Sequence, residues 1–246
     1  MTYMYDSDVI IRYGGFTRKE QPITLELEEA WRKKNKTVVW VVSHCHAHSK
    51  RENFVKELEK HIDIDIYGAC GPLKCARNLR ESCYRMFGEQ YYFYLSLENS
   101  LCDEYVTEKL YYPLQLNIIP VALSAVNYEV KAPPHSVIDV ASFATPRHLA
   151  DYLKRVMSDY DLYKSYLEWK RDYDVREWHG YDESFCGLCE KLHGPELRTY
   201  SAYDSVRSWW TNKSACYTYN DSTWIAVQSK IKLVGSPLTS NGIVAN

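Results

Sequence analysis

The sequence contains no long apolar run and carries little net charge. No stretch of its 246 residues approaches the roughly 18 apolar residues that a membrane-spanning helix needs, and its first residues lack the pattern of a secretory signal peptide. A formal net charge of −2 gives no electrostatic reason to expect nucleic acid or an anionic membrane as a partner. These absences favour a folded α/β or similar globular chain over a membrane or nucleic-acid-binding one.

The chain is instead rich in side chains that pack, stack and cross-link. It has 22 tyrosines and 7 tryptophans, whose rings suit both core packing and stacking on sugars or bases. Its 8 cysteines form an even set, and N-x-S/T sequons begin at Asn35, Asn212 and Asn220. Both features predict an oxidising compartment. Because no targeting segment accompanies them, we expect the chain to be a fragment of a longer protein or the product of an incomplete gene model.

Residues 91–123 read as a strand, a polar turn, a helix and a second strand. The runs 92–97 and 118–123 are apolar enough for strands buried on both faces, and Asp103 can cap a helix predicted over 106–116. This order predicts a right-handed β-α-β crossover, in which the loop after the first strand faces the ligand-binding crevice. The free N–H groups of the helix start and the charge of Lys109 favour an anion such as a phosphate there.

The string FYLSLENSLCDEYVTEKL, followed by the strand IIPVAL, closely resembles the donor-binding motif of the α-1,3-fucosyltransferases of glycosyltransferase family 10. In that family F-x-L-x-F-E-N-S precedes D-Y-[IV]-T-E-K and a V-P-V-V strand. Leu97 replaces the usual Phe, a core change of moderate cost. Ser124-Ala125 replaces the usual Gly, which bears on the loop because Gly takes positive φ freely. The resemblance implies an α/β fold with a Rossmann-like parallel sheet, the C-terminal donor half of a GT-B glycosyltransferase.

A second β-α-β unit precedes this one, with strands predicted over 37–42 and 62–67 and a helix over 51–61. Its loop, SHCHAHSKR, has three histidines and a cysteine, which raises the alternative of a zinc site. Residues two apart in a tight loop rarely all face one ion, so we favour a polar loop beside a ligand. The family pattern V-S-N-x6-R aligns with Ser43, with His44 in place of Asn, and with Arg51. It implies that Arg51 clamps a pyrophosphate bidentately.

The cysteines leave several pairings open. Residues 69–89 read as a surface loop held by a disulfide, either Cys70 with Cys75 or one of these with Cys83. Near the C-terminus, Phe185-Cys186-x-x-Cys189 resembles the family's F-C-x-L-C. Zinc and thioredoxin-like readings of this C-x-x-C lack a second ligand pair and a preceding strand. We therefore expect a structural disulfide there that involves Cys216.

The remaining segments read as connections and packing elements. We expect residues 17–35 to be compatible with a helix, 128–138 to form an extended loop and 137–140 a short strand. Amphipathic helices are predicted over 146–158 and 161–172.

The resemblance divides the chain into three parts. Residues 1–36 would be a remnant or connection from an acceptor domain, 37–177 the GDP-fucose-binding domain, and 178–246 a Cys/Trp-containing tail. It implies inverting transfer of fucose from GDP-fucose to the 3-hydroxyl of N-acetylglucosamine in a glycoprotein glycan, with no cofactor and no divalent metal. The full-length protein would reside in the Golgi membrane through a type II anchor outside this chain. The implied substrate-binding residues are Ser43, Arg51, Asn99, Tyr105, Glu108 and Lys109.

These residues would share the work of holding the donor. Arg51 and Lys109 would stabilise the charge growing on the departing diphosphate. Glu108 would accept hydrogen bonds from fucose hydroxyls, Asn99 and Tyr105 would position ribose or phosphate, and Ser43 would bind phosphate. The family's catalytic carboxylate lies in the acceptor domain, so no catalytic residue is expected here and this chain alone should bind donor but turn over poorly. The alternatives are a non-catalytic GDP-sugar-binding module and a disulfide-held interaction protein.

Overall fold

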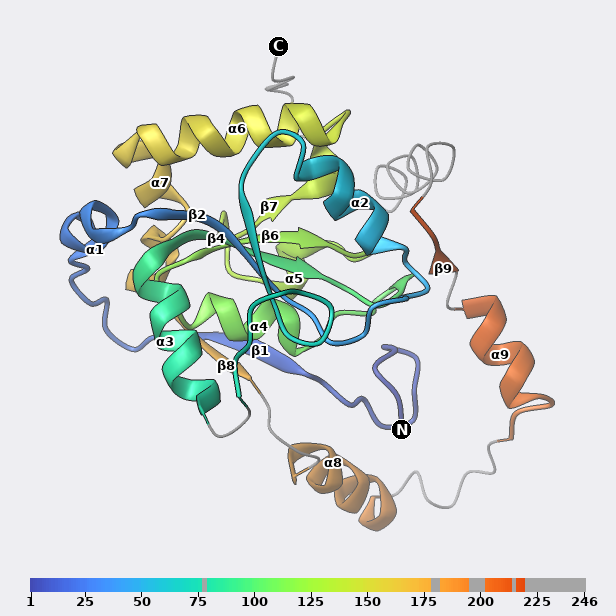
Figure 1. The fold of residues 1–246 in the computed structure, drawn as a ribbon. Coiled ribbons are helices and arrows are strands. Elements are labelled where there is room, and N and C mark those ends of the chain that lie inside the picture. Colours follow the sequence, from blue (N-terminus) through green and yellow to red (C-terminus); the bar gives the residue numbers. More distant parts are fainter. Residues whose placement is uncertain (77–78, 178–181, 195–201, 214–215, 220–246) are drawn as a thin grey trace.

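A five-stranded parallel sheet forms the centre of the molecule, in the order β3-β2-β4-β6-β7 (Figure 1). The computed structural model describes residues 1–76, 79–177, 182–194, 202–213 and 216–219. The strands of the sheet are β2 (Lys36–Val41), β3 (Ile64–Tyr67), β4 (Tyr91–Leu97), β6 (Ile119–Leu123) and β7 (Ile138–Asp139). All neighbouring strands run parallel. The predicted α/β class and Rossmann-like parallel sheet are therefore confirmed.

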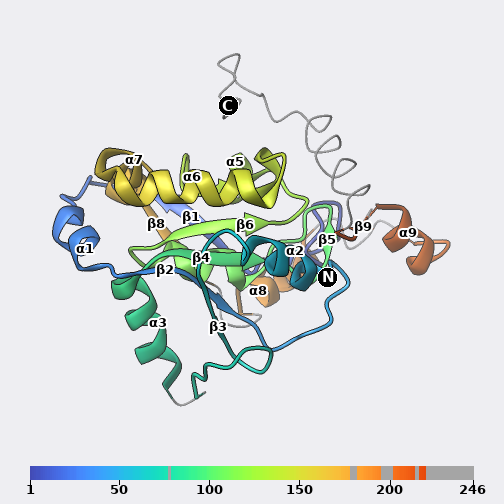
Figure 2. The ribbon, with the colours of Figure 1, turned by 45° about the horizontal axis from the view of Figure 1, so that its top comes forward.

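Helices cover both faces of the sheet, which is why its strands are apolar without alternation. All residues of β6 and all of β4 except Tyr92 are buried. One face packs Val38, Trp40 and Leu95 against α2 (Arg51–Leu58), α6 (Pro146–Ser158) and α7 (Tyr160–Ser165). The other face packs against α3 (Arg80–Gln90) and α4 (Glu108–Leu114). Figure 2 shows α6 and α3 on opposite sides of the strands.

Two short antiparallel pairs tie distant parts of the chain to this core. β1 (Gly14–Arg18) pairs with β8 (Tyr173–Glu177), and β5 (Leu101–Cys102) pairs with β9 (Cys216–Tyr217). The other elements are α1 (Leu27–Lys33), α5 (Tyr128–Lys131), η2 (Val140–Ser142), η3 (Glu168–Arg171), α8 (Asp182–His193) and α9 (Val206–Lys213). Within the described residues, no helix has the length and apolar character needed to cross a membrane.

The predicted strands and the helix over 146–158 are confirmed, whereas several other predictions were wrong in part. Residues 17–35 are not one helix, because Thr17 and Arg18 end strand β1 and α1 begins only at Leu27. The predicted extended loop over 128–138 begins with the short helix α5. The helix over 161–172 is interrupted after Ser165, and η3 follows. The structure of residues 17 and 18 is decided by the pairing of β1 with the distant strand β8, which local propensity does not encode.

The start of α4 also differs from the prediction. Asp103 does not cap the helix, since Thr107 is the N-cap residue and α4 begins at Glu108. The predicted polar turn instead contains the short strand β5, because Leu101 and Cys102 pair with β9. The predicted surface loop over 69–89 is helical from Arg80 onward.

Three disulfides are present in the described residues: Cys45–Cys70, Cys75–Cys83 and Cys102–Cys216. The predicted alternative in which Cys83 pairs with Cys70 or Cys75 is confirmed, because Cys83 pairs with Cys75. A Cys70–Cys75 bond is excluded, because Cys70 pairs with Cys45. The expected disulfide of the C-x-x-C segment was wrong, because Cys186 and Cys189 are exposed free thiols on α8 and Cys216 pairs with Cys102. The sequon at Asn220 and the segment after it lie outside the described residues.

Candidate functional site

A buried carboxylate organises the loop between β4 and α4. Glu98 directly follows β4 and is only 1% exposed. Its Oε1 accepts a hydrogen bond from the backbone N–H of Thr107 at 2.8 Å, and the Thr107 hydroxyl lies 2.9 Å from Oε2. The same hydroxyl caps α4 by accepting from the backbone N–H of Lys109. Glu98 thus connects the end of a central strand to the first turn of the helix.

The ammonium group of Lys109 lies among three oxygen-bearing side chains. Its Nζ donates to Thr107 Oγ1 at 2.9 Å and to Glu108 Oε1 at 3.0 Å, and it lies 3.6 Å from Glu98 Oε2. Burial raises the pKa of Glu98, against the opposing effect of Lys109 and of the hydrogen bonds from Thr107. Burial acts in the same direction on Glu108, but there the charge of Lys109 and the hydrogen bonds to the carboxylate together leave the pKa below its usual value.

Arg51 occupies the first position of α2 and is 3% exposed. Its Nη1 donates to the carbonyl of Leu97, at the end of β4, and its Nη2 donates to the carbonyl of His44 at 3.3 Å. Burial lowers the pKa of the guanidinium. Its Nε has no hydrogen-bond partner among the described residues. Two of its five N–H groups therefore join α2 to the end of β4 and to the loop after β2.

One cavity of about 210 Å³ brings these groups together at the carboxyl ends of β2 and β4. Arg51 and Lys109, the two predicted cationic residues, both line it. The predicted residues Ser43, Asn99 and Glu108 line it as well. Asn99 Oδ1 is buried and has no hydrogen-bond partner among the described residues. The remaining lining residues are Val41, Val42, His44, Arg80, Tyr84, Tyr94 and Tyr112. Five of the six predicted substrate-binding residues therefore meet in one place.

Tyr105 is the exception, because it is not among the residues that line this cavity. Its ring packs against the ring of Tyr3, with the centroids 5.1 Å apart. It follows Glu104, which has a positive φ of 62°, so the chain turns sharply just before it.

The sequence did not single out the α3 side of the cavity. Arg80 and Tyr84 line it from the segment that was predicted to be a surface loop, and the Arg80 guanidinium lies 5.0 Å from the centroid of the Tyr112 ring. The signal available in the sequence was the basic and aromatic content of residues 80–86 at helical spacing. It became meaningful only once α3 was known to pack beside α4.

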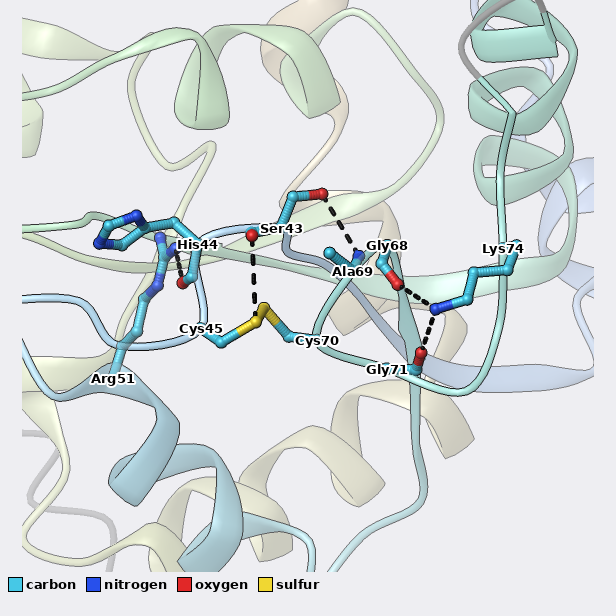
Figure 3. Close-up of a disulfide and its surroundings, with 9 residues drawn as sticks. All are labelled: Ser43, His44, Cys45, Arg51, Gly68, Ala69, Cys70, Gly71 and Lys74. Atoms are coloured by element: carbon cyan, nitrogen blue, oxygen red, sulfur yellow. Dashed lines mark hydrogen bonds between the residues drawn. A yellow bond between two sulfur atoms is a disulfide. The ribbon is translucent and has the colours of Figure 1, made fainter.

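Covalent and polar links fix the two loops that frame the cavity (Figure 3). The Cys45–Cys70 disulfide joins the loop after β2 to the loop after β3. Beside it, the Ser43 hydroxyl accepts from the backbone N–H of Ala69 at 3.4 Å. Gly68 has φ of +105° and no room for a side chain, since a Cβ would lie 2.4 Å from the carbonyl oxygen of Val42. Because Cys45 is in a disulfide, its thiolate is not available for the alternative zinc reading of this loop.

The loop after β6 needs no glycine. Neither Ser124 nor Ala125 is among the residues with positive φ, so this departure from the family pattern carries no backbone strain. Ser124 is buried and its hydroxyl donates to the Tyr128 hydroxyl at 2.8 Å.

Comparison with known sequences agrees with this geometry. The family described as glycosyltransferase family 10 (fucosyltransferase), C-terminal part, matches residues 31–209. Alpha-(1,3)-fucosyltransferase C of Drosophila melanogaster is 38% identical over 86% of this chain and 53% of its own length. Glycoprotein 3-alpha-L-fucosyltransferase A of the same organism is 35% identical over 88% of this chain and 44% of its own length. The chain thus spans about half the length of the curated relatives it matches.

Comparison with solved structures supports the fold. An α1,3-fucosyltransferase crystallised with GDP-fucose superposes with a TM-score of 0.50 at 19% identity, covering 69% of this chain and 50% of that one. A second crystal structure of an α1,3-fucosyltransferase gives a TM-score of 0.51 at 17% identity. At these identities the similarity concerns the arrangement of helices and strands, which matches the predicted half of a GT-B glycosyltransferase. The family match over residues 31–209 shows that this chain belongs to glycosyltransferase family 10, the fucosyltransferases.

Proposed function

We propose that this chain is the donor-binding part of an α-1,3-fucosyltransferase and that GDP-fucose binds in the cavity between Arg51 and Lys109. The observation that carries the proposal is the presence of both cationic side chains in one cavity at the carboxyl ends of parallel strands. Ligands of open α/β sheets bind at this edge. A related protein was crystallised with GDP-fucose, which supports the choice of ligand.

The chemistry of the cavity suits a diphosphate. Lys109 supplies a compact positive charge in the first turn of α4. Arg51 lines the same cavity, and its guanidinium can donate to a second phosphate or to an oxygen bridging the two. Asn99 also lines the cavity, and its amide is suited to hydrogen-bond a ribose hydroxyl or a sugar hydroxyl.

The same groups would serve the transfer step. As the bond between fucose and the diphosphate breaks, negative charge grows on the leaving phosphate, and preorganised cations stabilise that charge. Glu108, which Lys109 keeps ionised, would accept hydrogen bonds from fucose hydroxyls or lie near the developing sugar cation. Because cationic side chains would balance the charge of the diphosphate, we propose that the transfer needs no cofactor and no divalent metal.

We further propose inverting transfer to the 3-hydroxyl of N-acetylglucosamine in a glycoprotein glycan, in the Golgi. Inversion requires a base on the face opposite the leaving group. The curated relatives are named as α-(1,3)- and glycoprotein 3-α-fucosyltransferases, which supports the acceptor class. The proposed domain division places donor binding within residues 37–177, where all lining residues of the cavity lie.

The proposal is tested by calorimetric titration of the chain with GDP, GMP and guanosine. We expect GDP to bind best, and Lys109→Met to weaken GDP binding roughly tenfold or more, because a charge-assisted hydrogen bond is lost. Lys164→Met removes an ammonium from a surface ion pair with Glu168 and serves as the matched control, with no expected effect. Equal affinity for GDP and guanosine, or unchanged GDP affinity in Lys109→Met, would refute the proposed site. GDP binding without fucosyl transfer to a supplied acceptor would favour a non-catalytic GDP-sugar-binding module.

A further inference from the structure

A second cavity, of about 340 Å³, has five aromatic residues in its lining, beside the cationic residues Arg12, Lys131 and Arg176. The rings come from the N-terminal segment, from β1 and from α4: Tyr3, Tyr5, Tyr13, Phe16 and Tyr111. We call this space the aromatic cavity. Tyr5 and Tyr13 are 46% and 37% exposed, so both side chains reach solvent. Exposed aromatic rings around a hollow are more typical of a binding surface than of a packed core.

The aromatic cavity and the cavity of Arg51 and Lys109 lie on two sides of the same stretch of chain. Glu104, Val106 and Tyr111 line the aromatic cavity, whereas Glu108 and Tyr112 line the other one. The start of α4 is therefore a partition between the two. A substrate in one cavity lies next to a substrate in the other.

Tyr105 stands in this partition. Its ring contacts Tyr3, which lines the aromatic cavity, at 5.1 Å between centroids. Burial first, and then the negative charge of Glu98, raise the pKa of the Tyr105 hydroxyl. This side chain was predicted to bind the donor, and the structure places it against the wall of the aromatic cavity instead.

Polar groups at the rim of the aromatic cavity are held in defined positions. The Glu104 carboxylate accepts from the backbone N–H of Tyr5 at 2.6 Å, and Glu104 itself has the left-handed φ of 62°. Such a backbone conformation is costly for a residue other than glycine and persists where surrounding contacts enforce it. The Lys131 ammonium lies 4.1 Å from the centroid of the Tyr5 ring. Both an acceptor and a donor of hydrogen bonds thus border the rings.

This combination fits a sugar ring. A pyranose has apolar C–H faces that pack on aromatic rings and a rim of hydroxyls that need hydrogen-bond donors and acceptors, as the rings, Glu104 and Lys131 provide. The cavity on the solvent side of α2 is a weaker candidate, because it is bordered mainly by charged and polar side chains such as Lys50, His61 and Arg147.

We infer that the aromatic cavity binds a sugar residue of the acceptor glycan. The inference rests on the proposed function, because transfer requires the acceptor oxygen to come within about 3–3.5 Å of the reacting carbon of the donor. A site for the acceptor must therefore adjoin the donor cavity. The aromatic cavity does so across the start of α4, and Tyr105 contacts it there.

The test is saturation-transfer NMR and titration of the full chain with N,N′-diacetylchitobiose, in the absence of GDP. We expect the disaccharide to bind, and Tyr5→Ala and Tyr13→Ala each to weaken it roughly five- to tenfold through loss of a stacking face. Tyr160→Ala is the matched control, since this half-buried tyrosine contacts Trp31 on the α1 and α7 side of the sheet (Figure 1). GDP affinity and melting temperature, measured on the same samples, should be unchanged in the Tyr5 and Tyr13 variants.

The two proposals fail in different ways. If the wild-type chain binds GDP but no disaccharide, or if the disaccharide binds the Tyr5 and Tyr13 variants as well as wild type, the aromatic cavity is not the sugar site. If the disaccharide binds in a way that depends on Tyr5 but GDP does not bind, the proposed donor site is overturned and the assignment of the sugar as an acceptor falls with it. An unchanged melting temperature shows that a variant is still folded. Weaker binding of the disaccharide is then not caused by a general loss of structure.

Discussion

The carboxylate of Glu98 lies 3.6 Å from the ammonium of Lys109, and Thr107 bridges the two residues. Glu98 is buried, and Lys109 lines the cavity that it shares with Arg51, so a carboxyl group in the core holds the ammonium of Lys109 at the cavity wall. Glu98 therefore acts as a positioning residue for Lys109 and for the first turn of α4.

We predict that Glu98→Gln weakens GDP binding roughly tenfold, because Lys109 loses the charge that orients it while the amide oxygen still accepts from the Thr107 N–H. Calorimetry on the single variants and on Glu98→Gln/Lys109→Met provides the measurement. The double variant should bind GDP no more weakly than Lys109→Met alone, since both changes act through one ammonium group. Additive losses would show instead that Glu98 acts independently of Lys109.

The Cys45–Cys70 disulfide should support both the stability and the shape of the donor cavity. It closes a loop of 25 residues and holds the segment whose His44 carbonyl accepts from Arg51. We expect Cys45→Ser/Cys70→Ser to lower the free energy of unfolding by about 3 kcal/mol and to weaken GDP binding, measured by urea denaturation and calorimetry. Cys186→Ser/Cys189→Ser removes two exposed free thiols and no bond, so it should change neither quantity. An unaltered GDP affinity in the first variant would show that the loop keeps its shape without the link.

Lys34 makes stability depend on pH in the alkaline range. It is buried, its Nζ donates to the carbonyls of Gly88 and Tyr91 at the end of α3, and burial lowers its pKa from 10.5 to about 7. Between these values the unfolded chain binds more protons than the folded one, so the free energy of unfolding rises with pH. We predict an increase in the urea midpoint from pH 7 to pH 9 that is smaller in Lys34→Met. The same slope in both proteins would indicate that Lys34 stays protonated when folded.

Two glycines should respond to alanine in opposite directions. A Cβ at Gly14 would lie 2.3 Å from the buried ring of Tyr111 and 2.8 Å from the carbonyl oxygen of Arg176. Gly14→Ala is therefore expected to destabilise the protein by about 1–3 kcal/mol through overpacking. At Gly187, inside α8, the nearest atom would be 3.6 Å away, so Gly187→Ala should stabilise by about 0.5–1 kcal/mol through higher helix propensity. Thermal or urea denaturation gives both values, and a tolerated Gly14→Ala would mean that Tyr111 can move aside.

Local patterns in the sequence predicted the central strands well. The runs at 37–42, 92–97 and 118–123 are mostly apolar without alternation, which is typical of strands in a sheet covered on both faces. Five of the six residues that the two family patterns pointed to line one cavity, because they follow strands whose carboxyl ends meet. Tyr105 does not line that cavity, since the direction of a side chain beside the sharp turn at Glu104 depends on contacts with the N-terminal segment.

The sequence by itself determined the family, the parallel sheet and the charges available to a ligand, since these follow from short-range patterns of side chains. Only the tertiary structure decided that Cys102 pairs with Cys216 across 114 residues, that Arg51 is buried against two carbonyls, and that β1 joins β8. Those features depend on which distant segments come into contact. Such contacts follow from how the whole core packs, and no local pattern of residues encodes them.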